Sequence, residues 1–285
     1  MVRPQHSSNP PAHLRIAQAI RNDIESGRLR DGQRLPTTRA LAQEWQASQL
    51  TITKAMDQLA ADGYITSHDR SGRVVTTPTS LALTLAAPAR PTRSRVVYIG
   101  GYAGSGKSEF ARTLTRETNW AFLDKDTMAR PLIEPALEDL GSTIDDRESD
   151  IYLTRIRPRE YDALAAVVQE NLDCGNSVVA AAPYIREFAD RSWLDQSMSR
   201  AEAAGADVTF VWVRCTRETM LTYLRRRGAA RDTWKLSNWE KYSSGLDLSF
   251  GLPVDHVIVE NNPDSEPLRA QAQRLIEGFR REATP

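Results

Sequence analysis

The chain has 285 residues, of which 40% are hydrophobic and 26% are charged, and its 37 Lys and Arg balance 37 Asp and Glu. This composition is typical of a globular protein, and the length suits about two domains. No stretch approaches the roughly 20 consecutive apolar residues of a membrane span, and MVRPQHSSNP does not resemble a secretory signal. We therefore expect a cytoplasmic protein without a membrane partner.

The charge is distributed unevenly along the chain. Residues 1–95 carry 13 Lys and Arg against 7 Asp and Glu, a net charge of about +6, which leaves about −6 for the remainder. The N-terminal third is therefore the part suited to a polyanion such as DNA.

The two cysteines, Cys174 and Cys215, stand in unrelated contexts and outside any cluster of metal-ligand spacing. Neither a disulfide framework nor a zinc site is predicted from them. We expect both to be thiols in the core.

Residues 76–95, TTPTSLALTLAAPARPTRSR, contain three prolines and many Thr, Ser and Ala residues. Such a composition is typical of a linker. The alternation of Leu81, Leu83 and Leu85 leaves open a short edge strand that packs on one of the domains. The predicted division is a DNA-binding domain over 1–77, a linker over 78–94 and a nucleotide-binding domain over 95–285.

The N-terminal segment has the periodicity of three short helices. Ile16, Ile20 and Ile24 recur every fourth residue, which predicts an amphipathic helix that Gly27 can end. Further helices follow, which Thr37 or Thr38 and then Ser48 can cap. Gly63 can close the third helix, and YITSHDRSGRVV predicts two short strands around a polar tip. The pattern suits a winged helix-turn-helix, although any small three-helix bundle has the same periodicity.

The motifs LPTTR, TITKAM, DGYI and RSGRVV occur in this order and resemble the DNA-binding domain of the GntR family over roughly residues 12–76. The resemblance implies double-stranded operator DNA as a partner, with the third helix in the major groove and the wing in the minor groove. The residues that it implies at the DNA are Arg39, Ser48, Gln49, Thr51, Thr53, Lys54, Arg70 and Arg73.

Two positions depart from the commoner family pattern, which often has Arg where this chain has Gln49 and Thr53. Because Arg reads guanine and Gln pairs best with adenine, we expect a different operator. For the three arginines of that set, a solvated surface charge remains the alternative.

A phosphate-binding motif begins the second domain. GYAGSGKS, from Gly101 to Ser108, follows the apolar segment RVVYIG and precedes the helical segment EFARTLTRET. This is the strand, loop and helix context that the motif requires. Glycine N–H groups wrap phosphate oxygens, Lys107 neutralises the outer phosphates and Ser108 binds Mg²⁺. We predict ATP or another nucleoside triphosphate with Mg²⁺, bound by Gly101, Gly104, Ser105, Gly106, Lys107 and Ser108.

The segment NWAFLDKDTMAR predicts a second strand that ends at Asp124 and Asp126. Carboxylates at the C-terminal edge of a parallel sheet lie near the phosphates, where they can take a proton from an attacking hydroxyl or hold a metal-bound water. A helix N-cap is the alternative for these residues.

The rest of the chain alternates helices with apolar strands. A helix over 159–173 and strands at SVVAAAP, 208–215 and 256–262 predict a three-layer α/β domain with a parallel sheet. Between the last two strands lies a basic segment that could clamp phosphate from a lid or form a solvated helix face. Its basic residues are Arg217, Arg225, Arg226, Arg227, Arg231 and Lys235.

GYAGSGKS, FLDKD, VWVRCTRETMLTYLRRRGAARDTWKL and DHVIVENN together resemble the zeta-toxin-like and shikimate-kinase-like P-loop kinases over roughly residues 95–280. The resemblance implies an acceptor or metal role for Asp124 and Asp126, phosphate contacts for Arg227 and Arg231, and a place for Asn261 in the adenine pocket. With Lys107, the first four would be the catalytic residues, and Asp124 with Ser108 would hold the metal.

One departure from that class is the third strand, which ends in Ala180-Ala181-Ala182-Pro183 without a Walker B carboxylate. Asp124 would then have to support Mg²⁺, or turnover would be slow or absent. The residues placed where an acceptor pocket could form, with surface or core roles equally open, are Arg157, Arg159, Tyr184 and Arg186.

Together these patterns predict a transcriptional regulator whose operator affinity is controlled by a nucleotide and a small-molecule ligand. An active ATP-dependent small-molecule kinase with an attached DNA-binding domain is the alternative, and a zeta-like toxin is a third. We expect a homodimer, because two half-sites multiply specificity.

Overall fold

The computed structural model describes residues 10–25, 28–68, 72–76 and 93–282. The chain divides into two compact units, one comprising Met1–Thr84 and Asn262–Pro267 and the other Leu85–Asn261 and Leu268–Pro285. The predictions for Gly27, for Arg70 and for residues 78–92 of the linker, including its alternating leucines, lie outside the described residues. None of the described helices is long and apolar enough to cross a membrane.

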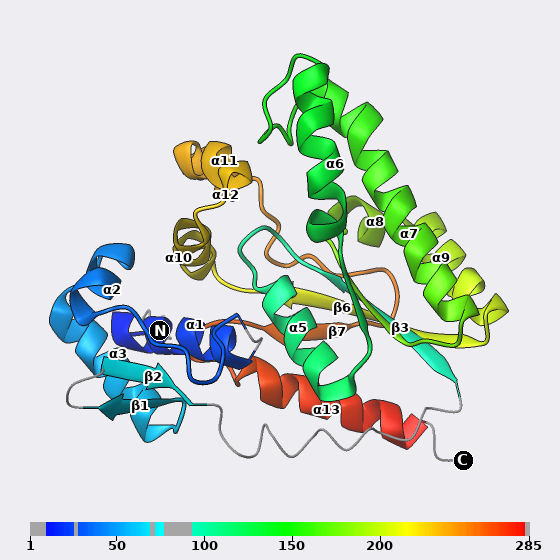
Figure 1. Cartoon of the computed structure of the whole chain (residues 1–285). Helices are drawn as coiled ribbons and strands as arrows, with labels where there is room; N and C mark the ends of the chain where they lie inside the picture. The colour runs from blue at the N-terminus through cyan, green and yellow to red at the C-terminus, as the bar shows by residue number, and fades with distance from the viewer. Residues whose placement is uncertain (1–9, 26–27, 69–71, 77–92, 283–285) are drawn as a thin grey trace, which may run out of the picture. The chain divides into compact units, whose positions relative to one another are not determined.

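The first unit is a helical bundle with a small antiparallel sheet, as predicted (Figure 1). Ile16, Ile20 and Ile24 are at most 3% exposed and pack with the apolar face of the third helix. The isoleucines at every fourth residue therefore predicted the buried face of α1 correctly. The elements are α1 (Ala12–Glu25), α2 (Thr38–Glu44), α3 (Gln49–Ala61), β1 (Ile65–His68) and β2 (Gly72–Val75).

The helix boundaries of this unit follow its capping residues. The Thr37 side chain accepts a hydrogen bond from Ala40 N at 3.2 Å, and Ser48 Oγ accepts one from Thr51 N at 3.1 Å. Each cap satisfies a backbone N–H that the helix itself leaves unpaired. Gly63 adopts a φ of +77° just after α3, which turns the chain into β1.

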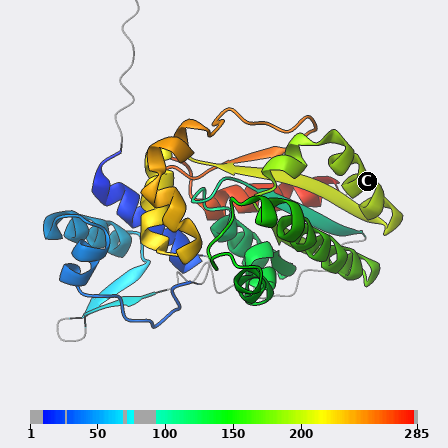
Figure 2. The same cartoon turned by 90° about the horizontal axis from the view of Figure 1, so that it is seen from above.

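The second unit is a three-layer α/β domain. Among the described residues, five parallel strands form its sheet in the order β4-β5-β3-β6-β7, with β3 at the centre (Figure 1). Figure 2 shows the same strands from above. The predicted fold class is confirmed. The strands are β3 (Ser94–Gly100), β4 (Ala121–Asp124), β5 (Val178–Ala181), β6 (Ala206–Arg214) and β7 (Val257–Glu260).

Helices cover both faces of this sheet. One apolar cluster joins the sheet to α5 and α13, and a second joins the opposite face to α7, α9 and α10. The helices are α5 (Lys107–Thr118), α6 (Lys125–Asp139), α7 (Arg157–Asp173), α8 (Ile185–Ala189), α9 (Arg191–Ala203), α10 (Arg217–Arg227), α11 (Thr233–Ser237), α12 (Trp239–Ser244) and α13 (Leu268–Glu282).

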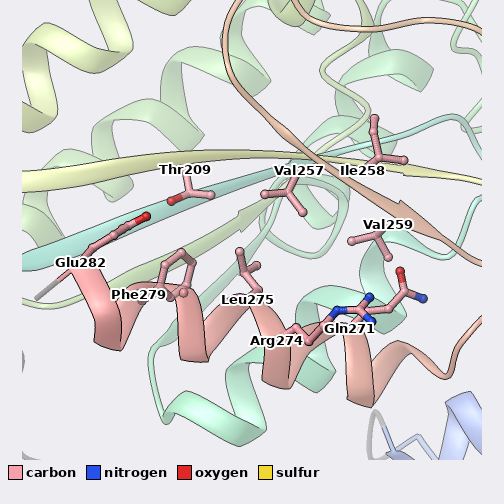
Figure 3. A pocket seen from close by; sticks show the side chains of 10 residues that line it. Thr209, Val257, Ile258, Val259, Gln271, Arg274, Leu275, Phe279 and Glu282 are labelled. Carbon is pink, nitrogen blue, oxygen red and sulfur yellow. The ribbon is translucent and has the colours of Figure 1, made fainter.

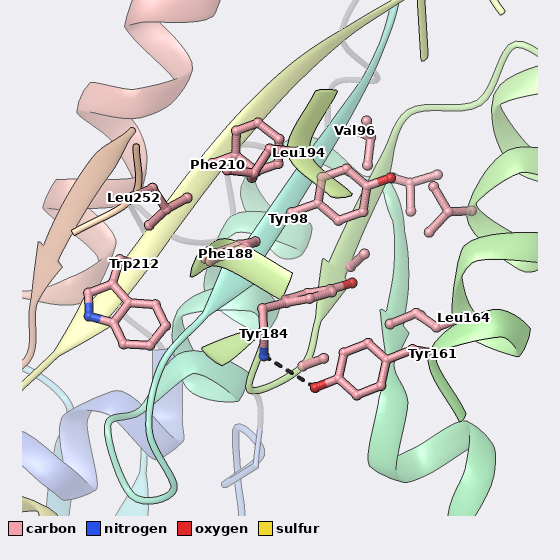
Figure 4. Close-up of a cluster of buried hydrophobic side chains, with 14 of the residues drawn as sticks. Val96, Tyr98, Tyr161, Leu164, Tyr184, Phe188, Leu194, Phe210, Trp212 and Leu252 are labelled. Carbon is pink, nitrogen blue, oxygen red and sulfur yellow. Dashed lines mark hydrogen bonds between the residues drawn. The ribbon is translucent and has the colours of Figure 1, made fainter. Parts of the chain in front are cut away.

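The second cluster is rich in aromatic rings (Figure 4). Tyr184 stacks on Phe188 with ring centroids 5.0 Å apart, and its backbone N–H donates to the Tyr161 hydroxyl at 3.2 Å. Tyr184 also adopts a φ of +51°, a left-handed conformation that is uncommon for a bulky residue. The packed rings therefore hold a backbone turn directly after β5.

Two details differ from the sequence-based expectations. Cys215 is buried, but Cys174 is exposed because it is the residue that ends α7, where the chain turns toward β5. In addition, Tyr152–Ile156 forms a short π-helix, η2, that leads into α7. Such turns are rare and often lie at functional sites.

Candidate nucleotide site and DNA-binding surface

The loop between β3 and α5 has the backbone of a phosphate cradle. Gly104 and Gly106 adopt φ values of +85° and +92°, which favour glycine. A Cβ atom at Gly104 would lie 2.8 Å from the Met220 carbonyl oxygen, and one at Gly106 would collide with the Asn261 side-chain amide. Both positions therefore require glycine for space as well as for conformation.

Asn261 lies at the end of β7 and is 2% exposed. Its Nδ2 donates to the Ser105 carbonyl oxygen at 3.0 Å. Asn261 thus stabilises the loop through this hydrogen bond, a role that the sequence did not reveal. Its contact with adenine stays a prediction.

Lys107 is only 7% exposed at the start of α5. Within the described part of the chain, its ammonium makes no ion pair or hydrogen bond, and Gly106 gives α5 no side-chain cap. Burial, and then the positive charge of Arg227, lower the pKa of Lys107 to about 8, against the opposing pull of Asp126 and Asp124. A buried cation beside uncapped helical N–H groups is a site for an anion.

The Lys107 ammonium predicts how nucleotide affinity depends on pH. A bound phosphate would favour the protonated ammonium and raise its pKa, so binding above pH 8 must take up a proton. We expect the affinity for ATP·Mg²⁺ to be level between pH 7 and 7.5 and to fall by nearly tenfold per pH unit above about 8. Calorimetric titration between pH 7 and 9.5 in buffers of different ionisation enthalpy measures this; a flat profile without proton uptake would contradict it.

Ser108 and Asp124 form the candidate Mg²⁺ site. Ser108 Oγ donates to Asp124 Oδ2 at 2.9 Å, while Asp124 Oδ1 accepts from Thr127 N at 3.0 Å and caps α6. The described residues hold no group of three or more His, Cys, Asp or Glu that could enclose a metal. Mg²⁺ commonly binds through one or two protein oxygens together with phosphates and waters, so this pair fits an ion that arrives with a nucleotide.

Asp126 lies two residues further on, in the first turn of α6. The predicted strand boundary was therefore wrong by two residues, and the N-cap of α6 is Asp124. Asp126 lies 3.2 Å from Lys125 Nζ and 3.4 Å from Arg231 Nη2. Burial alone would raise the pKa of Asp126, but the charges of Lys125, Arg231 and Lys107 outweigh it and hold that pKa well below the usual range. A carboxylate with so low a pKa is a weak base, so we expect Asp126 to orient a hydrogen-bond donor, and its catalytic role stays a prediction.

A buried ion pair, Lys125 with Glu160, lies next to Asp126. Lys125 Nζ lies 2.9 Å from Glu160 Oε2, and the Tyr152 hydroxyl donates to the same oxygen at 2.7 Å. The Lys125 and Glu160 side chains are 4% and 2% exposed. Sequence reasoning missed this cluster; the lysine between two aspartates was the one available signal.

The basic residues after β6 have different partners, and a phosphate clamp formed by them stays a prediction. Arg231, in the 3-10 turn η3 (Ala230–Asp232), faces Asp126, whereas Arg227 makes two hydrogen bonds of 2.7 and 2.6 Å to buried Asp232. Arg217 donates to backbone carbonyls at Ser243 and Leu246, which makes it structural. The positive charges of Arg227 and Arg231 both lower the pKa of Lys107. Contacts of these two arginines with phosphate stay a prediction.

The four acceptor-pocket candidates have different surroundings. Arg157 pairs with Glu187 at 2.8 Å, Tyr184 belongs to the core, Arg159 pairs with Asp162 on the surface, and Arg186 is exposed. A separate hollow of about 320 Å³ lies between the sheet edge and α13, where Val257, Leu275 and Phe279 line it (Figure 3). All of its lining residues come from β6, β7 and α13, so it is distinct from the phosphate loop.

The predicted DNA-facing residues of the first unit lie on α2, α3 and β2. Arg39, Ser48, Gln49 and Lys54 are exposed, and Thr51 and Thr53 are half-buried. Arg73 Nη1 donates to Thr38 Oγ1 at 2.8 Å, which ties β2 to the first turn of α2 beside Arg39. DNA contacts by these residues remain predictions.

The fold and both sites define a winged helix-turn-helix joined to a P-loop nucleotide-binding domain. Through residues 96–248, more than half its length, the chain belongs to a family described as AAA domain. Residues 12–75 match the family of bacterial regulatory proteins called the gntR family. Both resemblances seen in the sequence are thereby confirmed.

Curated relatives match the N-terminal domain. Over 62 residues the chain is 39% identical to the uncharacterized HTH-type transcriptional regulator YdeL of Bacillus subtilis, and over 61 residues it is 41% identical to the HTH-type transcriptional regulator TauR of Rhodobacter capsulatus. These matches cover 22% and 21% of this chain and 13% of each relative. The relatives thus share the DNA-binding domain, and the rest of their length lies outside the match.

Solved structures match the second domain weakly. The APS kinase CysC of Mycobacterium tuberculosis is 21% identical with a TM-score of 0.43, over 67% of this chain and 99% of that one. A gluconokinase of Sinorhizobium meliloti is 22% identical with a TM-score of 0.40, over 68% of this chain and 99% of that one.

Proposed function

We propose that this protein is a bacterial transcriptional regulator whose operator affinity depends on ATP·Mg²⁺ bound at the loop Gly101–Ser108. The observation that carries the proposal is the buried Lys107 in a glycine cradle, whose ammonium has no partner among the described residues, on the same chain as a gntR-family domain. With this role we expect the protein to be cytoplasmic. Ser108 and Asp124 would hold Mg²⁺, which supplies positive charge at the phosphates.

A second small molecule is the other expected ligand. Asp126 and Arg231 lie 3.4 Å apart beside Lys107 and offer a carboxylate and a guanidinium to a polar compound. Such a compound would act as effector in the regulator, or as phosphate acceptor if the domain is instead a working kinase. We infer binding as a homodimer to a two-fold-symmetric operator, since paired half-sites multiply specificity.

The decisive measurement is the coupling between operator binding and nucleotide binding. Operator DNA obtained by selection from a random duplex library is titrated with the full chain, without nucleotide and with saturating ATP·Mg²⁺ or ADP, at fixed salt. We expect one nucleotide to change operator affinity by about 5- to 150-fold, and the operator to change the affinity for that nucleotide by the same factor.

The kinase alternative predicts a different result in that titration. Superimposed isotherms at every nucleotide, accompanied by product formation when ATP and candidate acceptors are supplied, would overturn the regulatory proposal in favour of the kinase. Sedimentation on and off the operator decides the oligomeric state: one monomer that saturates a non-palindromic site would contradict the dimer.

A further inference from the structure

A leucine is exposed on the helix expected to enter the DNA. Leu50, the second residue of α3, keeps 66% of its surface exposed. Among the described residues of the range 10–76, it is the one large apolar residue that is exposed. Single exposed leucines are common on protein surfaces, so the argument depends on its neighbours.

Leu50 lies on the outer face of α3. The inner face consists of Ile52, Ala55, Met56 and Leu59, each at most 1% exposed. Leu50 shares its own face with Thr53 and Lys54, three and four residues further on. It therefore stands among the residues that the family resemblance assigns to DNA.

Most of the polar groups on that face are already engaged within the helix. Thr53 Oγ1 donates to the Gln49 carbonyl oxygen at 2.9 Å. Ser48 Oγ accepts from Thr51 N at 3.1 Å and lies 2.8 Å from Thr51 Oγ1. Because these hydroxyls already make hydrogen bonds at the helix terminus, the groups on this face that are freest to reach base edges are the Gln49 amide, the Lys54 ammonium and the Leu50 side chain.

We propose that Leu50 reads a thymine by packing on its C5-methyl group, next to an adenine read by Gln49. The thymine methyl is the apolar group that the major groove presents, and a glutamine amide matches adenine N6 and N7. Leu50 and Gln49 are adjacent in the first turn of α3, so the two contacts specify A·T pairs at neighbouring positions of each half-site. The inference rests on operator binding by α3 in the proposed function.

The test removes only the methyl group. In the selected operator, each thymine is replaced in turn by deoxyuridine, which keeps the hydrogen-bonding edges. For the full chain we expect one such replacement in a half-site to weaken binding about fourfold, equivalent to about 0.8 kcal/mol for one methyl group removed from water. Leu50→Ala should weaken binding to the unaltered operator by at least the same factor and be indifferent to that replacement.

The control is Leu132→Ala, which shortens a 74% exposed leucine on α6 and should leave the operator affinity and the uracil effect unchanged. The inference is overturned if the full chain tolerates uracil at every thymine, or if Leu50→Ala remains as sensitive as the parent. A change of oligomeric state in Leu50→Ala would assign the leucine to a protein contact and overturn it as well. If no operator is enriched at all, the proposed function fails together with this reading of Leu50.

Discussion

Lys107→Met is expected to weaken ATP·Mg²⁺ binding by about a hundredfold while operator affinity in the absence of nucleotide stays unchanged. The ammonium would make charge-assisted hydrogen bonds to phosphate oxygens, and hydrogen bonds to charged groups contribute about 1.5–3 kcal/mol. Because Lys107 is buried with a pKa lowered to about 8, the folded protein holds an unfavourable charge there. The variant should therefore be at least as stable as the parent, as is common at functional positions.

Calorimetric titration and thermal unfolding of the full chain check both halves of this expectation. Lys241→Met is the matched control, since Lys241 is an exposed lysine of α12 and its removal should leave nucleotide affinity unaltered. Unchanged nucleotide affinity in Lys107→Met would contradict a phosphate role for the lysine. A variant that binds poorly because it is unfolded would reveal itself by a lower unfolding temperature.

Much of this architecture was readable from local sequence signals. Caps at Thr37 and Ser48 and the isoleucine period of α1 depend on residues within one or two turns, so their effect does not require knowledge of the tertiary fold. The same holds for the place of the loop Gly101–Ser108 between β3 and α5, because its glycines and the flanking strand and helix are marked within a short stretch of sequence. These features were predicted correctly because their physical causes are short in range.

The features that the sequence did not reveal depend on distant residues. Asn261 reaches Ser105 across 156 positions, and Lys125 reaches Glu160 across 35. Neither pair has a recognisable spacing, because the order of the strands rather than the sequence separation brings them together. The π-helical turn Tyr152–Ile156, which leads into α7, was not predicted either.

Lys125→Met is expected to destabilise the second domain by about 3–5 kcal/mol, because it leaves the Glu160 carboxylate buried without its cation. Chemical unfolding followed by tryptophan fluorescence reports mainly this domain, since Trp120, Trp193, Trp212, Trp234 and Trp239 lie in it. Arg159→Met breaks an ion pair whose side chains are 80% and 67% exposed, and it should have little effect. An equally small effect in Lys125→Met would mean that Glu160 finds another partner.

Adding Glu160→Gln to Lys125→Met separates the two roles of the lysine. The amide carries no charge and its oxygen can still accept from the Tyr152 hydroxyl, so most of the lost stability should return. Asp126 would nevertheless lose the ammonium that lies 3.2 Å away in the parent chain, and of its ion pairs among the described residues the one with Arg231 would remain. If the double variant is stable yet a ligand that contacts Asp126 binds more weakly to it, Lys125 is a positioning residue as well as half of a buried pair. If that ligand binds as in the parent, the lysine serves the fold alone.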